Sequence, residues 1–338
     1  MRQGTVASGV VGVAPSETWQ SSIAMMTGIP PDQESAAITP LWSAASKNGV
    51  RTAAVYWPGT ESGSLDFSFP APLQRRRGDN VLFEDVARKA MPAGLADRVE
   101  KASPGFQKTL WTDASAESAA LYLLRAEKPD LLLIEFTDVE TEERETRMIS
   151  VYARQILEDE DDRVGRIAAA ISADTVLALV SGHGFENEDY IVRPRVLMKV
   201  PVEVQDGLIG TTSRAVAERV RMLMKDGRQH GIAREVPMTE VAAKAPSLAN
   251  WVAAFDTPTN FVAKADEKGP ALGPGSHLAV DGLWPGRPGY RSVFILAGPD
   301  IPARRIGEID LLQIAPTIAG LVGVELPQAR ARSLWPVN

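Results

Sequence analysis

The stretch Thr175-Val176-Leu177-Ala178-Leu179-Val180-Ser181-Gly182-His183-Gly184 is a mostly apolar run that ends in a histidine between two glycines. Such a run is typical of a buried strand, and glycines at its carboxyl end give the backbone freedom beside an open crevice. Ligand and metal sites of doubly wound α/β sheets collect at this edge. His183 is therefore a candidate ligand, although a loop histidine bonded to a backbone carbonyl explains it equally well when it is taken alone.

A second histidine lies in a similar glycine-rich loop. His277 closes the segment Gly273-Pro274-Gly275-Ser276-His277, upstream of another apolar run at residues 292–297. The chain has only 3 histidines, so two in such loops favour a shared site over two unrelated loop positions.

Strand-like and helix-like segments alternate along the chain. The strand-like segments are residues 6–13, 50–57, 131–136, 175–180 and 292–297. Helical periodicity or helix capping is found in residues 18–26, 41–48, 81–90, 114–127, 142–172, 212–225 and 311–322. This alternation predicts an α/β fold with a doubly wound, mostly parallel sheet and helices on both faces.

The long helical segment is expected to lie on the sheet. Its apolar residues fall at helical spacing, and they are Ile149, Tyr152, Ala153, Ile156, Leu157, Val164, Ile167, Ala168 and Ile171. The acidic run at residues 158–162 predicts a solvated face, because adjacent helical positions point in different directions.

One large domain with an insertion is the expected organisation. Between the two glycine loops the pattern is mixed, with strand-like residues 190–198 and 200–204 and a hairpin predicted at 251–255 and 260–265. We expect a single α/β domain over residues 1–338, with residues 186–290 forming a small inserted cap or subdomain.

Composition excludes several classes of function. The chain has 36 basic and 43 acidic residues and a formal net charge of −7, which disfavours a general nucleic-acid binder. It has no cysteine, so disulfides and thiolate catalysis are excluded. No apolar run approaches the ~18 residues of a membrane span, and Met1 to Thr5 lacks the apolar core of a signal peptide. The sequence as it stands predicts a soluble protein of unknown oligomeric state.

Thr18 is a candidate nucleophile. It is expected to be the N-cap of a helix that follows a strand. A hydroxyl at this place can be activated by the helix dipole and a bound cation, and a helix N-terminus binds phosphate. A plain capping threonine is the simpler interpretation of this residue alone.

Several ordered segments resemble the alkaline phosphatase superfamily, and within it the type I phosphodiesterase/nucleotide pyrophosphatase branch. The segment from Pro15 to Pro31 resembles its nucleophile motif, in which an aromatic residue follows the threonine and Thr-Gly and Pro come later. Residues 181–185 resemble its Ser-Asp-His-Gly-Phe/Met loop, and Gly275-Ser276-His277 its Gly-Thr/Ser-His-Gly loop. Residues 297–301 and 310–319 resemble its last strand and helix.

This resemblance implies an alkaline phosphatase-like fold and hydrolysis of a small phosphorylated substrate. In the family, two divalent cations, usually zinc, are held by Asp and His and activate a Thr or Ser nucleophile. Carried over, Thr18 is the nucleophile, and His183 and His277 are one ligand at either cation.

Part of the expected ligand set is replaced in this chain. Gly182 stands where the family has an Asp, and Ser22 stands where a His closes the nucleophile motif. The family also begins with a strand that ends in an Asp ligand, and this chain starts after that point.

The family's Asp-x-x-x-His pair fits the chain in two registers. One places Glu140 at the Asp and Arg144 at the His, and the other uses Asp138 and Glu142. The first is preferred because residues 162–165 then match a downstream Asp-x-x-Val/Leu-Gly motif. In either register the histidine is missing, and arginine cannot coordinate a cation.

Three hypotheses remain open. The chain is a phosphodiesterase that depends on zinc or another divalent cation and uses Thr18. Alternatively it is a pseudoenzyme with little or no turnover, which binds an anion with Arg144 replacing part of the metal charge, or serves as an interaction module. The third is an N-terminally truncated member, which predicts a gap or rearranged strand pairing near residues 6–13 and 131–136. Family members are often exported, so a signal peptide upstream of Met1 stays an alternative and the compartment is open.

Overall fold

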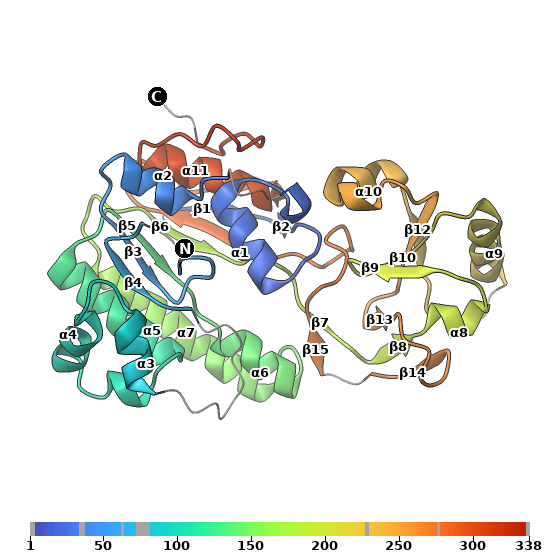
Figure 1. The fold of residues 1–338 in the computed structure, drawn as a ribbon, viewed down its shortest axis with the longest axis horizontal. Coiled ribbons are helices and arrows are strands. Elements are labelled where there is room, and N and C mark those ends of the chain that lie inside the picture. Colours follow the sequence, from blue (N-terminus) through green and yellow to red (C-terminus); the bar gives the residue numbers. More distant parts are fainter. Residues whose placement is uncertain are drawn as a thin grey trace.

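The fold is α/β, as the sequence predicts, with helices on both faces of the sheets (Figure 1). The computed structural model describes residues 4–33, 38–61, 64–71, 82–226, 230–275 and 278–335. In Figure 1 the core carries most of the helices, and the part between β7 and β15 extends away from it to the right. None of the helices within the described ranges is long and apolar enough to cross a membrane.

The first core sheet has four strands in the order β17-β1-β16-β6. These strands are β1 (Gly4–Ala7), β6 (Leu177–Val180), β16 (Phe294–Ala297) and β17 (Arg304–Ile306). β1 is parallel to β17, whereas β16 is antiparallel to both β1 and β6. The predicted mostly parallel arrangement is therefore only partly met here.

The second core sheet is fully parallel. β3 (Thr52–Val55) lies between β4 (Phe67–Phe69) and β5 (Leu131–Ile134), with Ala53 opposite both Phe67 and Leu132. Among the described strands, β5 pairs with β3 alone and β6 with β16 alone. The predicted break in pairing is confirmed, because β1 pairs with β16 and β17 instead of β5.

Two groups of helices enclose these sheets. On one side, α1 (Thr18–Thr27), α2 (Leu41–Lys47) and α11 (Ile314–Leu321) share a core with both sheets. This core joins the sheets through Ala24, Met25, Leu131, Leu133, Leu296 and Ile314. On the other side, α3 (Phe83–Lys89), α4 (Leu95–Ala102) and α5 (Asp113–Tyr122) pack on β3 and β4 around Phe69 and Phe106.

The last helix starts as the sequence predicts. Asp310 ends β18 (Ile309–Asp310), which pairs with β2 (Val10–Val11). Its side chain accepts a hydrogen bond from the Leu312 amide at 3.0 Å, and Gln313 completes a capping box.

The predicted helix over residues 142–172 is two helices. α6 spans Asp138–Thr146 and α7 spans Val151–Ala170. The chain turns between them through Arg147 and Ile149, whose φ angles are 81° and 58°. These left-handed conformations interrupt the helical hydrogen bonds, so the sequence periodicity continues across a break that it does not reveal.

The expected packing of the α7 apolar face on the sheet is wrong for most of its residues. Ala153 and Ile167 are buried, but Tyr152 is 68% exposed, and Ile149 and Leu157 are also exposed. Polar contacts hold α7 instead, since Arg163 and Arg166 form ion pairs with Glu117 of α5. The acidic run at residues 158–162 is largely exposed, as predicted.

Residues 186–290 build three small sheets of their own. One has the order β11-β12-β10-β9, from β11 (Arg234–Val236), β12 (Ala253–Asp256), β10 (Leu208–Thr211) and β9 (Glu203–Gln205). The others are β13-β8-β14, from Phe261–Ala263, Tyr190–Val192 and Leu272–Pro274, and β15-β7, from Ala279–Val280 and Glu186–Asn187. The helices of this part are α8 (Pro194–Met198), α9 (Arg214–Lys225) and α10 (Met238–Lys244).

Two predictions in this part are wrong. The expected hairpin does not form, because β12 pairs with β10 and β11 while β13 runs parallel to β8. The strand predicted to reach Met198 ends at Val192, and Pro194 begins α8 because its fixed φ suits a first helical turn.

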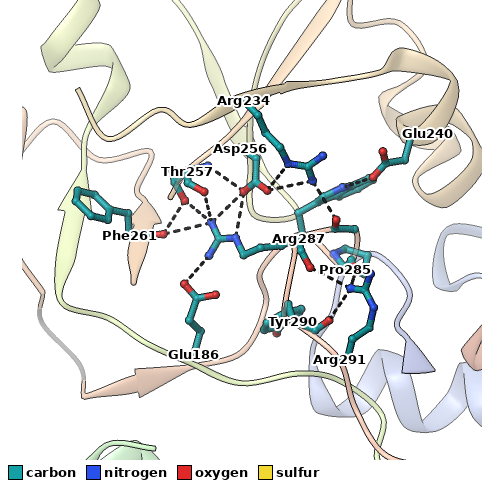
Figure 2. A network of polar contacts seen from close by, with 12 residues as sticks. Glu186, Arg234, Glu240, Asp256, Thr257, Phe261, Pro285, Arg287, Tyr290 and Arg291 are labelled. Carbon is teal, nitrogen blue, oxygen red and sulfur yellow. Dashed lines mark hydrogen bonds and ion pairs between the residues drawn. The ribbon is translucent and has the colours of Figure 1, made fainter. Parts of the chain in front are cut away.

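A buried ionic network joins the sheets of residues 186–290 (Figure 2). Arg287 and Asp256 are each 1% exposed, and Arg287 Nη2 donates to Asp256 Oδ1 at 2.9 Å. Arg287 Nη1 donates to Glu186 Oε1 at 3.1 Å, and Arg234 Nη2 donates to Asp256 Oδ2 at 3.3 Å. Arg287 also donates to the carbonyls of Thr257 and Phe261. The side chain of Arg287 thus joins β7, β12 and the segment between β15 and β16.

Removing Asp256 should destabilise this part of the protein strongly. Asp256→Ala leaves the Arg287 guanidinium buried beside Glu186 alone, which should cost about 3–5 kcal/mol of unfolding free energy. Urea unfolding followed by circular dichroism measures this loss. Asp266→Ala is the matched control, because Asp266 pairs with Arg193 at the surface and its loss should cost less than about 1 kcal/mol. An equally small loss of unfolding free energy in both variants would contradict the stabilising role of the Arg287–Asp256 pair.

Candidate active site

Thr18 lies where α1 begins and points at two other side chains. Its Oγ1 donates to Glu140 Oε1 at 3.2 Å and lies 3.3 Å from His183 Nε2. The N-cap of α1 is Glu17, so the prediction that Thr18 caps the helix is wrong. As the first helical residue, Thr18 has a hydroxyl that is free of capping and available to the site.

Glu140 reaches Thr18 from the first turn of α6, just after β5. Asp138, its alternative in the other register, instead accepts a hydrogen bond from the Asp113 amide at 3.1 Å. The structure thus brings Glu140 to Thr18 and His183, while Asp138 packs against the start of α5.

His183 presents one ring nitrogen to the site. Its Nδ1 lies 2.9 Å from the Gly184 carbonyl and donates to it, which leaves the Nε2 lone pair directed into the site, 3.3 Å from Thr18 Oγ1. The backbone hydrogen bond expected of a loop histidine is therefore present together with the contact to Thr18. The flanking glycines are required by packing, because a Cβ on Gly182 would lie 2.7 Å from Ser21 Cβ and one on Gly184 2.8 Å from the Tyr290 ring.

Asp281 completes the cluster, and the sequence analysis missed it. It follows β15, and its Oδ2 lies 3.9 Å from His183 Nε2, while Glu140 Oε2 lies 4.0 Å from the same nitrogen. One ligand atom from each of Glu140, His183 and Asp281 lies within 4.8 Å of the others. The signal in the sequence is an Asp-Gly pair after two apolar residues, four positions beyond His277. His277 itself lies outside the described residues.

Arg144 forms one wall of the cluster. One turn beyond Glu140 on α6, its Nη2 donates to Glu140 Oε1 at 2.8 Å and pairs with Asp281 Oδ2 at 2.8 Å. Its guanidinium carbon lies 5.1 Å from the centre of the Phe185 ring. Arg144, which the preferred register places at the family's His position, thus faces the site as a fixed positive charge.

The donor set fits one divalent cation. Two carboxylates and an imidazole are ligands that zinc takes, and the hydroxyl of Thr18 lies beside them. Ligands of a tetrahedral zinc are separated by about 3.4 Å, close to the 3.2 Å and 3.3 Å from Thr18 Oγ1 to Glu140 and His183, and the ligand atoms of Glu140, His183 and Asp281 lie within 4.8 Å of one another. A second cation does not fit the described residues in the same way, because Arg144 and Gly182 replace two of the ligands that the resemblance implies.

Excess negative charge surrounds the end of β5. Burial, together with repulsion from Glu140, Asp113 and Glu61, raises the pKa of Glu135 to about 8. Burial and the nearby Asp113 and Asp138 raise the pKa of Glu160 on α7 to about 7. The region therefore holds protons near neutral pH that exposed carboxyl groups would have lost.

A sequence profile of the family type I phosphodiesterase / nucleotide pyrophosphatase matches residues 32–247, more than half of the chain. The chain belongs to this family. Its members are phosphodiesterase- and pyrophosphatase-type hydrolases, and the matched segment includes Glu140 and His183. No curated protein matches the chain in sequence.

Solved structures show the same alkaline phosphatase-like fold. Human ectonucleotide pyrophosphatase/phosphodiesterase 5 is 13% identical in sequence to this chain and superposes with a TM-score of 0.62. The match covers 98% of this chain and 89% of the human protein's chain. Murine ectonucleotide pyrophosphatase/phosphodiesterase 5 is 14% identical with a TM-score of 0.58, and the match covers 100% of this chain and 90% of the murine chain. An inactive threonine-to-alanine variant of the murine protein, in complex with AMP, is 13% identical with a TM-score of 0.58. This match covers 100% of this chain and 89% of the variant's chain. At this identity the likeness concerns the fold alone.

Glu135 should make the stability of this family member depend on pH. Its folded-state pKa of about 8 exceeds the ordinary 4.5, so its favourable contribution is complete below pH 4.5 and is lost as the pH rises through 8. We expect the unfolding free energy of the wild type to fall relative to that of Glu135→Gln between pH 5 and 8. Urea unfolding at several pH values measures this difference. Glu267→Gln, at an exposed position, is the control. Parallel plots of unfolding free energy against pH for the wild type and Glu135→Gln would refute the raised pKa of Glu135.

Proposed function

We propose that the protein hydrolyses phosphodiester or pyrophosphate bonds, with Thr18 as nucleophile and a divalent cation held by Glu140, His183 and Asp281. The observation that carries this proposal is the contact of one hydroxyl with both Glu140 and His183. Glu140 lies 122 positions from Thr18 in the chain, and His183 lies 165 positions from it. A capping threonine alone has no need of such partners.

In the proposed reaction, Thr18 Oγ1 attacks the phosphorus atom and the bond to the leaving oxygen breaks. The hydroxyl proton passes to a water molecule, because Glu140, which accepts its hydrogen bond here, would be occupied as a ligand of the cation. The leaving oxygen takes a proton from water, and a second water molecule then hydrolyses the phosphothreonine by the reverse sequence. A cation bound at the cluster would lower the pKa of the hydroxyl and polarise the phosphoryl group.

The start of α1 supports binding of the phosphoryl group. Glu17 makes no side-chain capping bond, and the first turn carries no acidic residue. The amides of Thr18, Trp19 and Gln20 therefore keep their donors for an anion, at the positive end of a 10-residue helix.

The substrate we expect is a small phosphorylated molecule, and a nucleotide is the class to test first. The AMP complex of the murine relative supports this choice. We further propose that residues 186–290 act as a cap, because Asp281 from this part and Arg144 from the core form an ion pair across the site. Arg147 and Asp189 make a second such pair.

One observation favours the alternative of a pseudoenzyme. Arg144 already neutralises part of the charge on Glu140 and Asp281, so the cluster can persist without a cation and bind an anion without turning it over. The two functions differ in turnover, which is directly measurable.

Hydrolysis of bis(4-nitrophenyl) phosphate and of a 4-nitrophenyl nucleotide ester, with zinc or manganese added, tests the proposal. Thr18→Ala should lower kcat by about 10³-fold or more, while Thr18→Ser retains activity within about 10- to 100-fold because it keeps the hydroxyl. Thr27→Ala, at the other end of α1, is the control for helix damage. Turnover that survives in Thr18→Ala would exclude this nucleophile, and its absence in the wild type under all metals would favour the pseudoenzyme.

A further inference from the structure

We infer that the guanidinium of Arg144 takes the place of a second cation, so that the centre holds a single divalent ion. This inference deepens the proposed function and rests on the same site. It starts from the position of Arg144, which binds the two carboxylates of the cluster at once, each at 2.8 Å.

The charges of the cluster favour a single divalent ion. Glu140, Asp281 and Arg144, the charged side chains in direct contact within the cluster, carry a net charge of −1 when His183 is neutral and the carboxyl groups around the end of β5 are left out of the count. One divalent cation brings this to +1, which suits a singly charged phosphodiester. A second would bring it to +3 within a few ångströms of the fixed charge on Arg144, at a strong electrostatic cost.

The packing around Gly182 removes the room for another ligand. A Cβ at this position would lie 2.7 Å from Ser21 Cβ on α1, too close without a backbone shift. Ser21 of α1, the helix that begins at Thr18, therefore occupies the space that a longer residue at position 182 would need. The absence of a ligand at Gly182 and the positive charge of Arg144 both favour a centre with one cation instead of two.

Arg144 also keeps a donor for the substrate. Its Nε and Nη2 bind Glu140, and Nη2 also binds Asp281. In the part of the chain that the structure describes, Nη1 has no hydrogen-bond partner, and the side chain is 39% exposed. Arg144 can therefore donate to a phosphoryl oxygen, the task of a metal ion at such a centre.

Metal content of the full-length protein tests the inference without reference to activity. Isothermal titration with Zn²⁺ and mass spectrometry of the dialysed protein should give one ion per chain. Arg144→Gln should bind this ion about tenfold more tightly, because a nearby positive charge is removed and both carboxylates are released. Glu140→Gln should lose it. Arg154→Gln is the matched control, because Arg154 is an exposed arginine on α7 outside the cluster.

Binding of inorganic phosphate to the zinc-loaded protein tests the second role of Arg144. Arg144→Gln should weaken it about tenfold or more, and Arg154→Gln should not. Two ions or none in the wild type, an unchanged zinc affinity in Arg144→Gln, or an unchanged phosphate affinity would each overturn the inference. One zinc ion per chain without turnover would instead defeat the proposed hydrolysis and leave this inference standing.

Discussion

The buried pair of Arg287 and Asp256 is the constraint on which the shape of the site depends. It holds β12, β7 and the segment between β15 and β16 at one point, and the pair is fully removed from water. Burial raises the pKa of Glu186 even though Arg287 opposes the rise, which indicates how fully this junction is enclosed. Glu186 lies three positions after His183, and Asp281 lies six before Arg287. A buried ionic junction thus fixes the two segments that carry an imidazole and a carboxylate into the site, which nonspecific apolar packing would do with less precision.

The site is assembled where the core meets residues 186–290. Thr18, Glu140 and His183 lie at or near the ends of three core elements, whereas Asp281 directly follows β15. Arg144 connects the two groups, and its position gives the cluster a charge balance that differs from that of a centre with two metal ions. An arginine at this place removes one possible ligand and adds one positive charge, so its effect exceeds that of losing a single histidine.

Local sequence predicted the elements well and their pairing poorly. The runs that became β5, β6 and β16 are continuous and apolar, and Asp310 has an unambiguous capping signal, so these features were predictable. The hairpin at residues 251–265 was wrong because strand partners are chosen by contacts distant in sequence, and the break at Arg147 was missed because periodicity persists across it. For the candidate site, motifs singled out Thr18, Glu140 and His183, whose side chains lie together in the structure. Asp281 was not singled out, because an Asp-Gly pair is common in turns and only tertiary packing brings it to His183.

The divided sheet has a consequence for the precision of the site. Glu140 follows β5 in one sheet, while His183 follows β6 in the other, and no backbone ladder among the described strands joins the two. The separation between the carboxylate and the imidazole is therefore set by side chains packed between α1, α2 and α11, which yield more readily than hydrogen-bonded strands.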